Sequence, residues 1–163
     1  MVMARRVTID QMRRRMEATF NRASALPHED ELCADISDYL CVRISGFVER
    51  SIFELLSEHT RPRAAANIAE FVSAKIEKNT NLDSGKLPEI LGQFDQKWKQ
   101  SVELFFKNNP DCKEALDAVV HKRHRIAHGY PDRAGLVAVK KWFELVVKLV
   151  AHLESVVTGV APR

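Results

Sequence analysis

Hydrophobic residues recur at steps of three and four along most of this chain, which is the spacing of a helix buried on one side. The clearest stripe lies between about residues 29 and 59 and consists of Leu32, Ile36, Tyr39, Leu40, Ile44, Phe47, Val48, Ile52, Leu55 and Leu56. A similar stripe runs from about residue 134 to residue 157. The Asn-Gly and Asp-Gly pairs that make tight hairpins do not occur. The pattern predicts an all-α protein.

Prolines, glycines and polar stretches divide the chain into helices. The first is expected to begin at Thr8 and to run to about residue 25, before Pro27. The others are expected at about 29–59, 61–78, 87–91, 94–107, from 112 to the histidine cluster, and 134–157. We expect one domain over residues 1–163, with a basic N-terminal helix (1–27) and a core bundle (28–158). Four main helices build it, with short helical insertions.

Composition narrows the class of protein. The chain has 163 residues, of which 45% are hydrophobic, so a folded core is expected rather than disorder. The net charge is only +3, which excludes a polycation and leaves any contact with RNA to local clusters. One cluster is the N-terminal helix, where Arg13 and Arg14 are candidate RNA contacts. Alternatively, these arginines form a solvent-exposed helix face that binds no RNA.

Cysteine usage and hydropathy predict the compartment. The three cysteines, an odd number, indicate reduced thiols. No apolar run approaches the ~20 residues that cross a bilayer, and no apolar stretch follows the N-terminal arginines as in a secretion signal. We expect a cytoplasmic protein without a membrane partner.

Residues 121–131, His-Lys-Arg-His-Arg-Ile-Ala-His-Gly-Tyr-Pro, carry the candidate chemistry. Histidine exchanges protons near neutral pH, and the arginine fork is suited to holding a phosphate. Gly129 and Pro131 stop the preceding helix at this point. Such a cluster favours phosphodiester chemistry on RNA without a metal or other cofactor, with Lys122 and Arg125 as further RNA contacts.

Arg123 to Tyr130 resembles the signature of the HEPN superfamily, an arginine followed by a histidine four to six positions later. His124 occupies the position next to the arginine, where the family most often has asparagine. The segment Ser45-Gly46-Phe47-Val48-Glu49 is similar to the RiboL-PSP-HEPN subgroup. The resemblance implies a helical bundle and, for many members, metal-independent RNase activity.

By this resemblance, Arg123 and His128 are the catalytic candidates. His128 would transfer protons between the 2′-hydroxyl and the leaving 5′-oxygen, and Arg123 would hold the phosphate. His124, Glu49 and Tyr130 are expected in supporting roles, with Glu49 orienting Arg123. The products would be a 2′,3′-cyclic phosphate and a 5′-hydroxyl, from a toxin or a defence effector.

The spacing of the catalytic pair constrains the site. Five residues at about 100° each place Arg123 and His128 roughly 140° apart on a straight helix, whereas His124 and His128 share a face. The pair can converge only if the helix distorts or a second copy of the site faces the first. In HEPN proteins the second arrangement occurs, so a homodimer with a composite site is expected.

Other readings of the cluster remain open. His128 could cap the helix end while Arg123 forms a surface salt bridge. His124 and His128 have the spacing of zinc ligands on a helix, but Arg125 stands where zinc peptidases place glutamate. Tyr130 either packs beside Pro131 or, as in some HEPN toxins, is modified by a nucleotidyltransferase that acts as antitoxin. The rival to an RNase is a non-catalytic HEPN domain that binds nucleotide, RNA or protein.

Overall fold

The computed structural model describes residues 2–27, 31–130 and 134–160, and from residue 8 onward the side chains of these residues as well. Within this part of the chain, seven helices and no strand are present, which confirms the all-α prediction. They are α1 (Val2–Ala23), α2 (Glu31–Thr60), α3 (Ala66–Glu77), α4 (Lys86–Gly92), α5 (Gln96–Asn108), α6 (Pro110–Ala127) and α7 (Leu136–Thr158). The four longest are α1, α2, α6 and α7.

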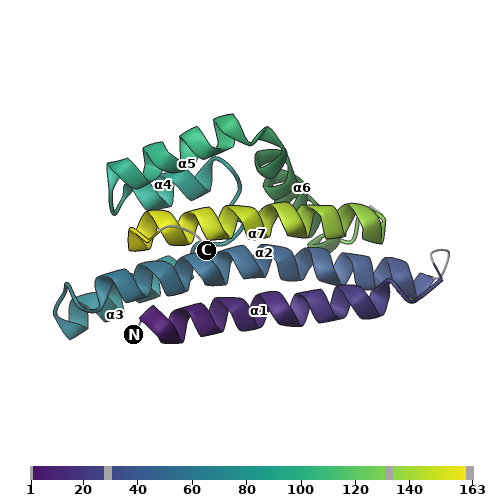
Figure 1. Ribbon diagram of the computed structural model, residues 1–163, viewed down its shortest axis with the longest axis horizontal. Helices are drawn as coiled ribbons and strands as arrows, with labels where there is room; N and C mark the ends of the chain where they lie inside the picture. Colours follow the sequence, from purple (N-terminus) through teal and green to yellow (C-terminus); the bar gives the residue numbers. More distant parts are fainter. Residues whose placement is uncertain (1, 28–30, 131–133, 161–163) are drawn as a thin grey trace.

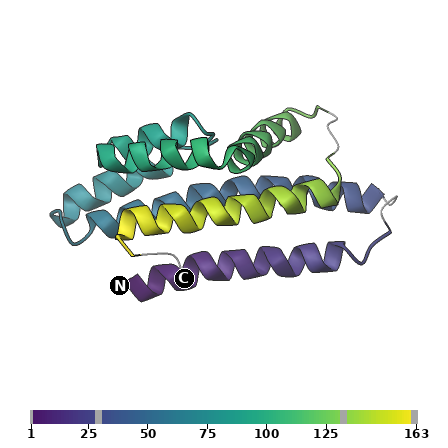
Figure 2. The same cartoon turned by 45° about the horizontal axis from the view of Figure 1, so that its top comes forward.

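The long helix α2 is the centre of the bundle. It packs against α7, α6, α1 and α3, while α4 and α5 pair with each other above α2 and α7 (Figure 1). Helices α1, α2 and α7 run side by side along the length of the molecule, and α6 packs on α2 and α7 on the same side as α4 and α5 (Figure 2). The C-terminal end of α6, which carries the histidine cluster, is therefore positioned by its packing on α2 and α7.

One continuous core joins these helices. Leu40, Ile44 and Ile52 of α2 are fully buried together with Val146 and Leu149 of α7. Helix α1 belongs to the same core, because the rings of Phe20 and Phe143 stack with their centroids 5.2 Å apart. Burial of these apolar side chains stabilises each helix far more than the intrinsic helix propensity of its residues does.

Two residues of the predicted α2 stripe do not face the core. The side chains of Leu32 and Tyr39 are about half exposed, whereas the later members of the stripe are buried. Positions 32, 39 and 46 are seven apart, so they share the outward face of α2. The buried face is therefore narrower at the N-terminal end of α2 than the sequence predicts.

Three predicted helix starts are also corrected. Helix α1 begins at Val2 rather than at Thr8, so Thr8 lies inside the helix and does not cap it. Helix α3 begins at Ala66, since residues 61–64 form a turn that closes α2. Helix α6 begins at Pro110, because proline needs no amide partner in a first turn.

No helix in the described ranges is both long and apolar enough to cross a membrane.

Candidate active site

The C-terminal end of α6 is a Schellman motif. Gly129 takes a φ of +71°, and its N–H donates to the carbonyl of Ile126 at 3.1 Å. The N–H of Tyr130 donates to the carbonyl of Arg125 at 3.0 Å. Glycine adopts this left-handed conformation without steric cost, so the sequence His-Gly-Tyr ends the helix at a defined residue. The prediction that Gly129 terminates the helix is confirmed.

Arg123 is held by two partners from other parts of the fold. Its Nη1 atom lies 3.5 Å from Oε1 of Glu49 on α2, and it also donates a hydrogen bond to Oδ1 of Asn81. The backbone N–H of Asn81 in turn donates to the same Glu49 oxygen at 2.7 Å. The contact expected between Glu49 and Arg123 is therefore present, and Asn81 completes a triangle with them.

The geometry of this triangle leaves part of the guanidinium available. Both contacts of Arg123 use Nη1, and its side chain is 28% exposed. Among the described residues, the donors on Nη2 and Nε have no hydrogen-bond partner. An arginine that is oriented on one side and open on the other is suited to bind an oxyanion through its remaining donors.

The loop that carries Asn81 is anchored to α6 itself. Asp117 accepts hydrogen bonds from the backbone N–H and the hydroxyl of Ser84, both at 2.8 Å, and from Lys113 at 3.1 Å. Burial raises the pKa of Asp117, but these hydrogen bonds outweigh burial and leave its pKa below the usual value. Asn81 has a φ of 55°, a left-handed conformation that asparagine tolerates better than most residues.

The two histidines at the helix end lie together. The ring centroids of His124 and His128 are 4.4 Å apart, and both side chains are exposed. This confirms that residues four apart share a face of α6. In the described ranges, no group of three His, Cys, Asp or Glu side chains is close enough to hold a metal ion. The two rings therefore form an exposed pair of imidazoles at the end of α6.

The catalytic candidates do not converge within one copy of the chain. Arg123 points to α2 and the Asn81 loop, whereas His128 contacts His124. Helix α6 stays regular from Pro110 to Ala127, so no bend compensates for the angular offset between the two residues. Of the two arrangements that could bring them together, the distorted helix is absent.

Arg125 and Tyr130 interact across the helix end. The guanidinium carbon of Arg125 lies 5.4 Å from the centre of the Tyr130 ring, a cation–π geometry. The Tyr130 side chain remains 58% exposed, so its hydroxyl is accessible to another protein. Pro131, the neighbour against which packing was considered, lies outside the described residues.

Lys122 has a structural environment that does not fit the expected RNA contact. Its side chain is only 3% exposed, and its Nζ atom lies 3.2 Å from Oδ1 of Asp38 on α2. A buried ammonium is stable only when its charge is compensated, and Asp38 provides that compensation. Lys122 therefore ties α6 to α2 and is not available to RNA.

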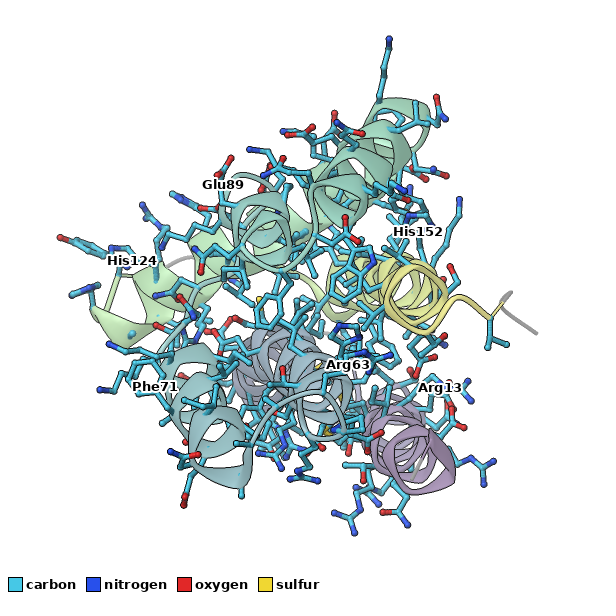
Figure 3. All side chains as sticks on the ribbon, turned by 90° about the vertical axis from the view of Figure 1, so that its left-hand side faces the viewer. Arg13, Arg63, Phe71, Glu89, His124 and His152 are labelled. Atoms are coloured by element: carbon cyan, nitrogen blue, oxygen red, sulfur yellow. The ribbon has the colours of Figure 1, made fainter. Side chains whose placement is uncertain are left out.

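The two expected RNA contacts of α1 are also placed by the structure. Arg13 forms ion pairs with Asp10 at 3.3 Å and with Glu17 at 3.1 Å. Figure 3 shows Arg13 and His124 on opposite sides of the molecule. Arg14, the neighbour of Arg13 on α1, is exposed. The structure therefore brings neither side chain to the end of α6.

Sequence reasoning missed two residues near Arg123. Asn81 lies in a polar loop, where nothing in the sequence distinguishes it from its neighbours. Arg43 lines a hollow of about 310 Å³ together with Gly46 and Arg123. The signal for Arg43 was its position three residues before Gly46, which places both on one face of α2.

The comparisons with known proteins identify the family of the chain. The family model of the RiboL-PSP-HEPN family matches residues 15–159, which includes Glu49 and the whole α6 cluster. No curated protein and no solved structure is significantly similar to the chain. HEPN domains are all-helical and are often RNases. By its sequence over most of its length, the chain belongs to the RiboL-PSP-HEPN family.

Proposed function

We propose that this protein is a metal-independent endoribonuclease. The 2′-oxygen of a ribose attacks the adjacent phosphorus, a new O2′–P bond forms, and the P–O5′ bond breaks. The proton of the 2′-hydroxyl passes to a base, and the leaving 5′-oxygen receives a proton. The products are a 2′,3′-cyclic phosphate and a 5′-hydroxyl, so no water and no redox partner enters this step.

The observation that carries the proposal is the environment of Arg123. A guanidinium held by Glu49 and Asn81, with its other donors open, is preorganised to bind the phosphate and to stabilise the charge that develops on it. Preorganisation matters because no donor needs to reorient when the charge forms. His128, exposed at the end of the same helix, is our candidate for proton transfer, with His124 beside it.

A homodimer supports this chemistry better than a single copy. Arg123 and His128 are directed to different partners on a regular helix, so one chain does not assemble both around one phosphate. We propose that two copies pack symmetrically and that Arg123 of one faces His128 of the other. A two-fold interface repeats this pairing twice, which gives two equivalent centres.

Tyr130 supports a proposal about control. Its exposed hydroxyl lies two residues from His128, so a group transferred to it would block access to the histidine. We propose that the RNase is a cytoplasmic toxin or defence effector that a partner nucleotidyltransferase silences at Tyr130. Mass spectrometry after co-expression with an adjacent nucleotidyltransferase tests this, and an unmodified Tyr130 would remove the proposal.

The activity is tested by incubating mixed RNA with purified protein in EDTA, beside Arg123→Ala and His128→Ala. We expect cleavage by the wild type and a loss of about 10²–10⁴-fold in the His128→Ala variant. Product ends are identified by phosphatase resistance, which a cyclic phosphate confers. Equal cleavage by wild type and His128→Ala would rule out the proposed site. RNA binding without cleavage in any form would instead favour a non-catalytic HEPN domain.

A further inference from the structure

Two neighbouring hollows form a trough between α1 and α2 that ends at Arg123. The first, of about 350 Å³, is lined by Arg15 and Arg22 of α1 and by Tyr39 of α2. The second, of about 310 Å³, contains Gly46 and Arg123. Met16 and Arg43 line both hollows, so the two lie side by side. We call the surface formed by Arg15, Arg22, Arg43 and Arg123 the arginine trough.

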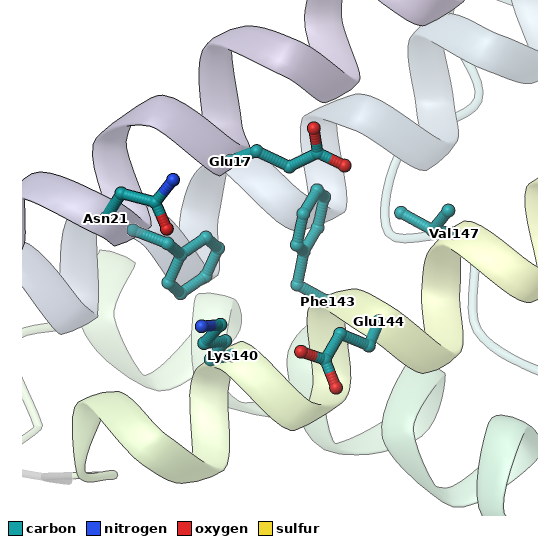
Figure 4. A pocket seen from close by; sticks show the side chains of 7 residues that line it. Glu17, Asn21, Lys140, Phe143, Glu144 and Val147 are labelled. Atoms are coloured by element: carbon teal, nitrogen blue, oxygen red, sulfur yellow. The ribbon is translucent and has the colours of Figure 1, made fainter. Parts of the chain in front are cut away.

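The trough has charge of one sign. Four arginines line it, and no acidic side chain does so among the described residues. The other side of α1 is different. The hollow between α1 and α7 is lined by Glu17, Lys140 and Glu144 (Figure 4), and Glu17 also neutralises Arg13. Among the described side chains of α1, Arg13 is therefore paired with carboxylates, whereas Arg15 and Arg22 line a hollow without an acidic side chain.

The lining residues suit a single-stranded polynucleotide. Arginine binds phosphate oxygens through two parallel N–H donors, which lysine does not. Arg15 and Arg22 are seven residues apart, about 10 Å along the helix, so they can contact successive parts of one backbone. Tyr39 is 51% exposed at the same end of the trough, with the guanidinium carbon of Arg43 5.7 Å from the centre of its ring, and the exposed part of the ring can stack on a base.

Gly46 leaves the floor of the trough bare. It lies in the middle of a 30-residue helix, where glycine costs about 1 kcal/mol relative to alanine. A Cβ atom at this position would meet nothing within 4 Å, so packing inside the protein does not require glycine. An occupant that lies close to the α2 backbone would require it.

We propose that the arginine trough binds the single-stranded RNA that adjoins the phosphate held by Arg123. This inference rests on the proposed RNase function and adds the path of the substrate. It also moves the RNA contacts of α1 from Arg13 and Arg14 to Arg15 and Arg22.

The test is fluorescence anisotropy with a labelled poly(U) oligonucleotide, in a His128→Ala background that prevents cleavage. Arg15→Gln/Arg22→Gln is compared with Arg13→Gln/Arg14→Gln, which removes the same charge from the same helix outside the trough. We expect the trough pair to bind about tenfold more weakly. The slope of log affinity against log salt should become shallower by about 1.4, because two phosphate contacts are lost. Equal losses in both pairs would overturn the proposal.

Gly46→Leu adds a probe that leaves the charge unchanged. Leucine favours helix, so the fold is retained, which circular dichroism verifies. We expect weaker binding with the salt slope of the parent protein. Unchanged RNA binding by Gly46→Leu would contradict the proposal that RNA lies against the α2 backbone at Gly46. If the trough variants alter the mass in light scattering and leave RNA binding intact, the trough is an interface between copies, and the RNA assignment is wrong.

A dinucleoside phosphate substrate separates this inference from the proposed function, because it reaches Arg123 but is too short to extend to Arg15 and Arg22. We expect Arg15→Gln/Arg22→Gln with an intact His128 to cleave it like the wild type and to cleave long RNA more slowly. Equal cleavage of long RNA by this variant and the wild type would overturn the trough alone. If the wild type binds RNA, Arg15→Gln/Arg22→Gln weakens that binding, and the wild type cleaves no RNA, the proposed RNase activity alone is overturned.

Discussion

Nη1 of Arg123 on α6 lies 3.5 Å from Oε1 of Glu49 on α2, and Asn81 contacts both residues. This triangle joins two core helices and the loop before α4 at the residue that we assign to the phosphate. A charged pair that is partly shielded from water orients an arginine more firmly than an exposed pair does. The core of the bundle therefore determines where the guanidinium points.

Glu49→Gln should lower the RNase activity without unfolding the protein. The amide keeps the shape of the side chain and loses the charge that orients Arg123. We expect kcat/KM to fall about tenfold, which corresponds to ~1.4 kcal/mol, and Glu49→Asp to restore part of it. Glu54→Gln, which removes a carboxylate that pairs with Arg50 on the same helix, is the control. Equal effects of the two substitutions would show that Glu49 has no special role.

The Lys122–Asp38 pair should respond unequally to the loss of either partner. Asp38→Ala removes the carboxylate that lies 3.2 Å from the buried Nζ atom of Lys122 and should lower the free energy of unfolding by about 3 kcal/mol. Lys122→Met leaves the buried Oδ1 atom of Asp38 without the ammonium, but the Asp38 side chain is one-third exposed and can turn toward water, so we expect a cost of ~1 kcal/mol or less. Urea denaturation measures both changes. A greater loss in Lys122→Met would contradict the assignment of Lys122 as a structural residue.

Gly46→Ala should stabilise the protein. The position is helical and the space around a new Cβ is open, so alanine gains helix propensity without a clash. We expect the free energy of unfolding to rise by roughly 0.5–1 kcal/mol. Thermal denaturation of the two proteins at equal concentration measures this. A less stable Gly46→Ala variant would mean that the α2 backbone has a contact which the monomer does not show.

Stability should decrease as the pH falls below the ordinary histidine range. Burial lowers the pKa of His59 and of His152, with nearby Arg63 adding to the effect at His59. The unfolded chain then binds more protons than the folded one, so the stabilisation is complete above about pH 6.5 and is lost as the pH falls through the lowered pKa values. Thermal midpoints at about pH 7.5 and 5 measure the loss.

A His59→Gln/His152→Gln variant is the matched comparison for the pH series. It should show a weaker dependence of the thermal midpoint on pH over the same interval, because the two titrating groups are gone. The same dependence in both proteins would assign the effect to other groups.

The sequence predicted the helices well because each long apolar stripe repeats at helical spacing. The sequence also predicted that α6 ends at Gly129, because a glycine followed two residues later by a proline is a local signal for the end of a helix. What it could not predict depends on contacts between distant segments. Asn81 meets Arg123 because Ser84 anchors its loop to Asp117 and because Glu49 holds its backbone N–H. Lys122 faces Asp38 across the α2–α6 interface, a contact between residues that are far apart in the sequence.

The most direct test of the account uses a mixed dimer. Arg123→Ala and His128→Ala chains with different tags are co-expressed, and the dimer that contains one of each is purified. If Arg123 of one copy works with His128 of the other, this dimer retains one intact pair and cleaves RNA, while both parent variants are inactive. A mixed dimer that is as inactive as its parents, at the mass of two chains, would contradict a site shared between copies.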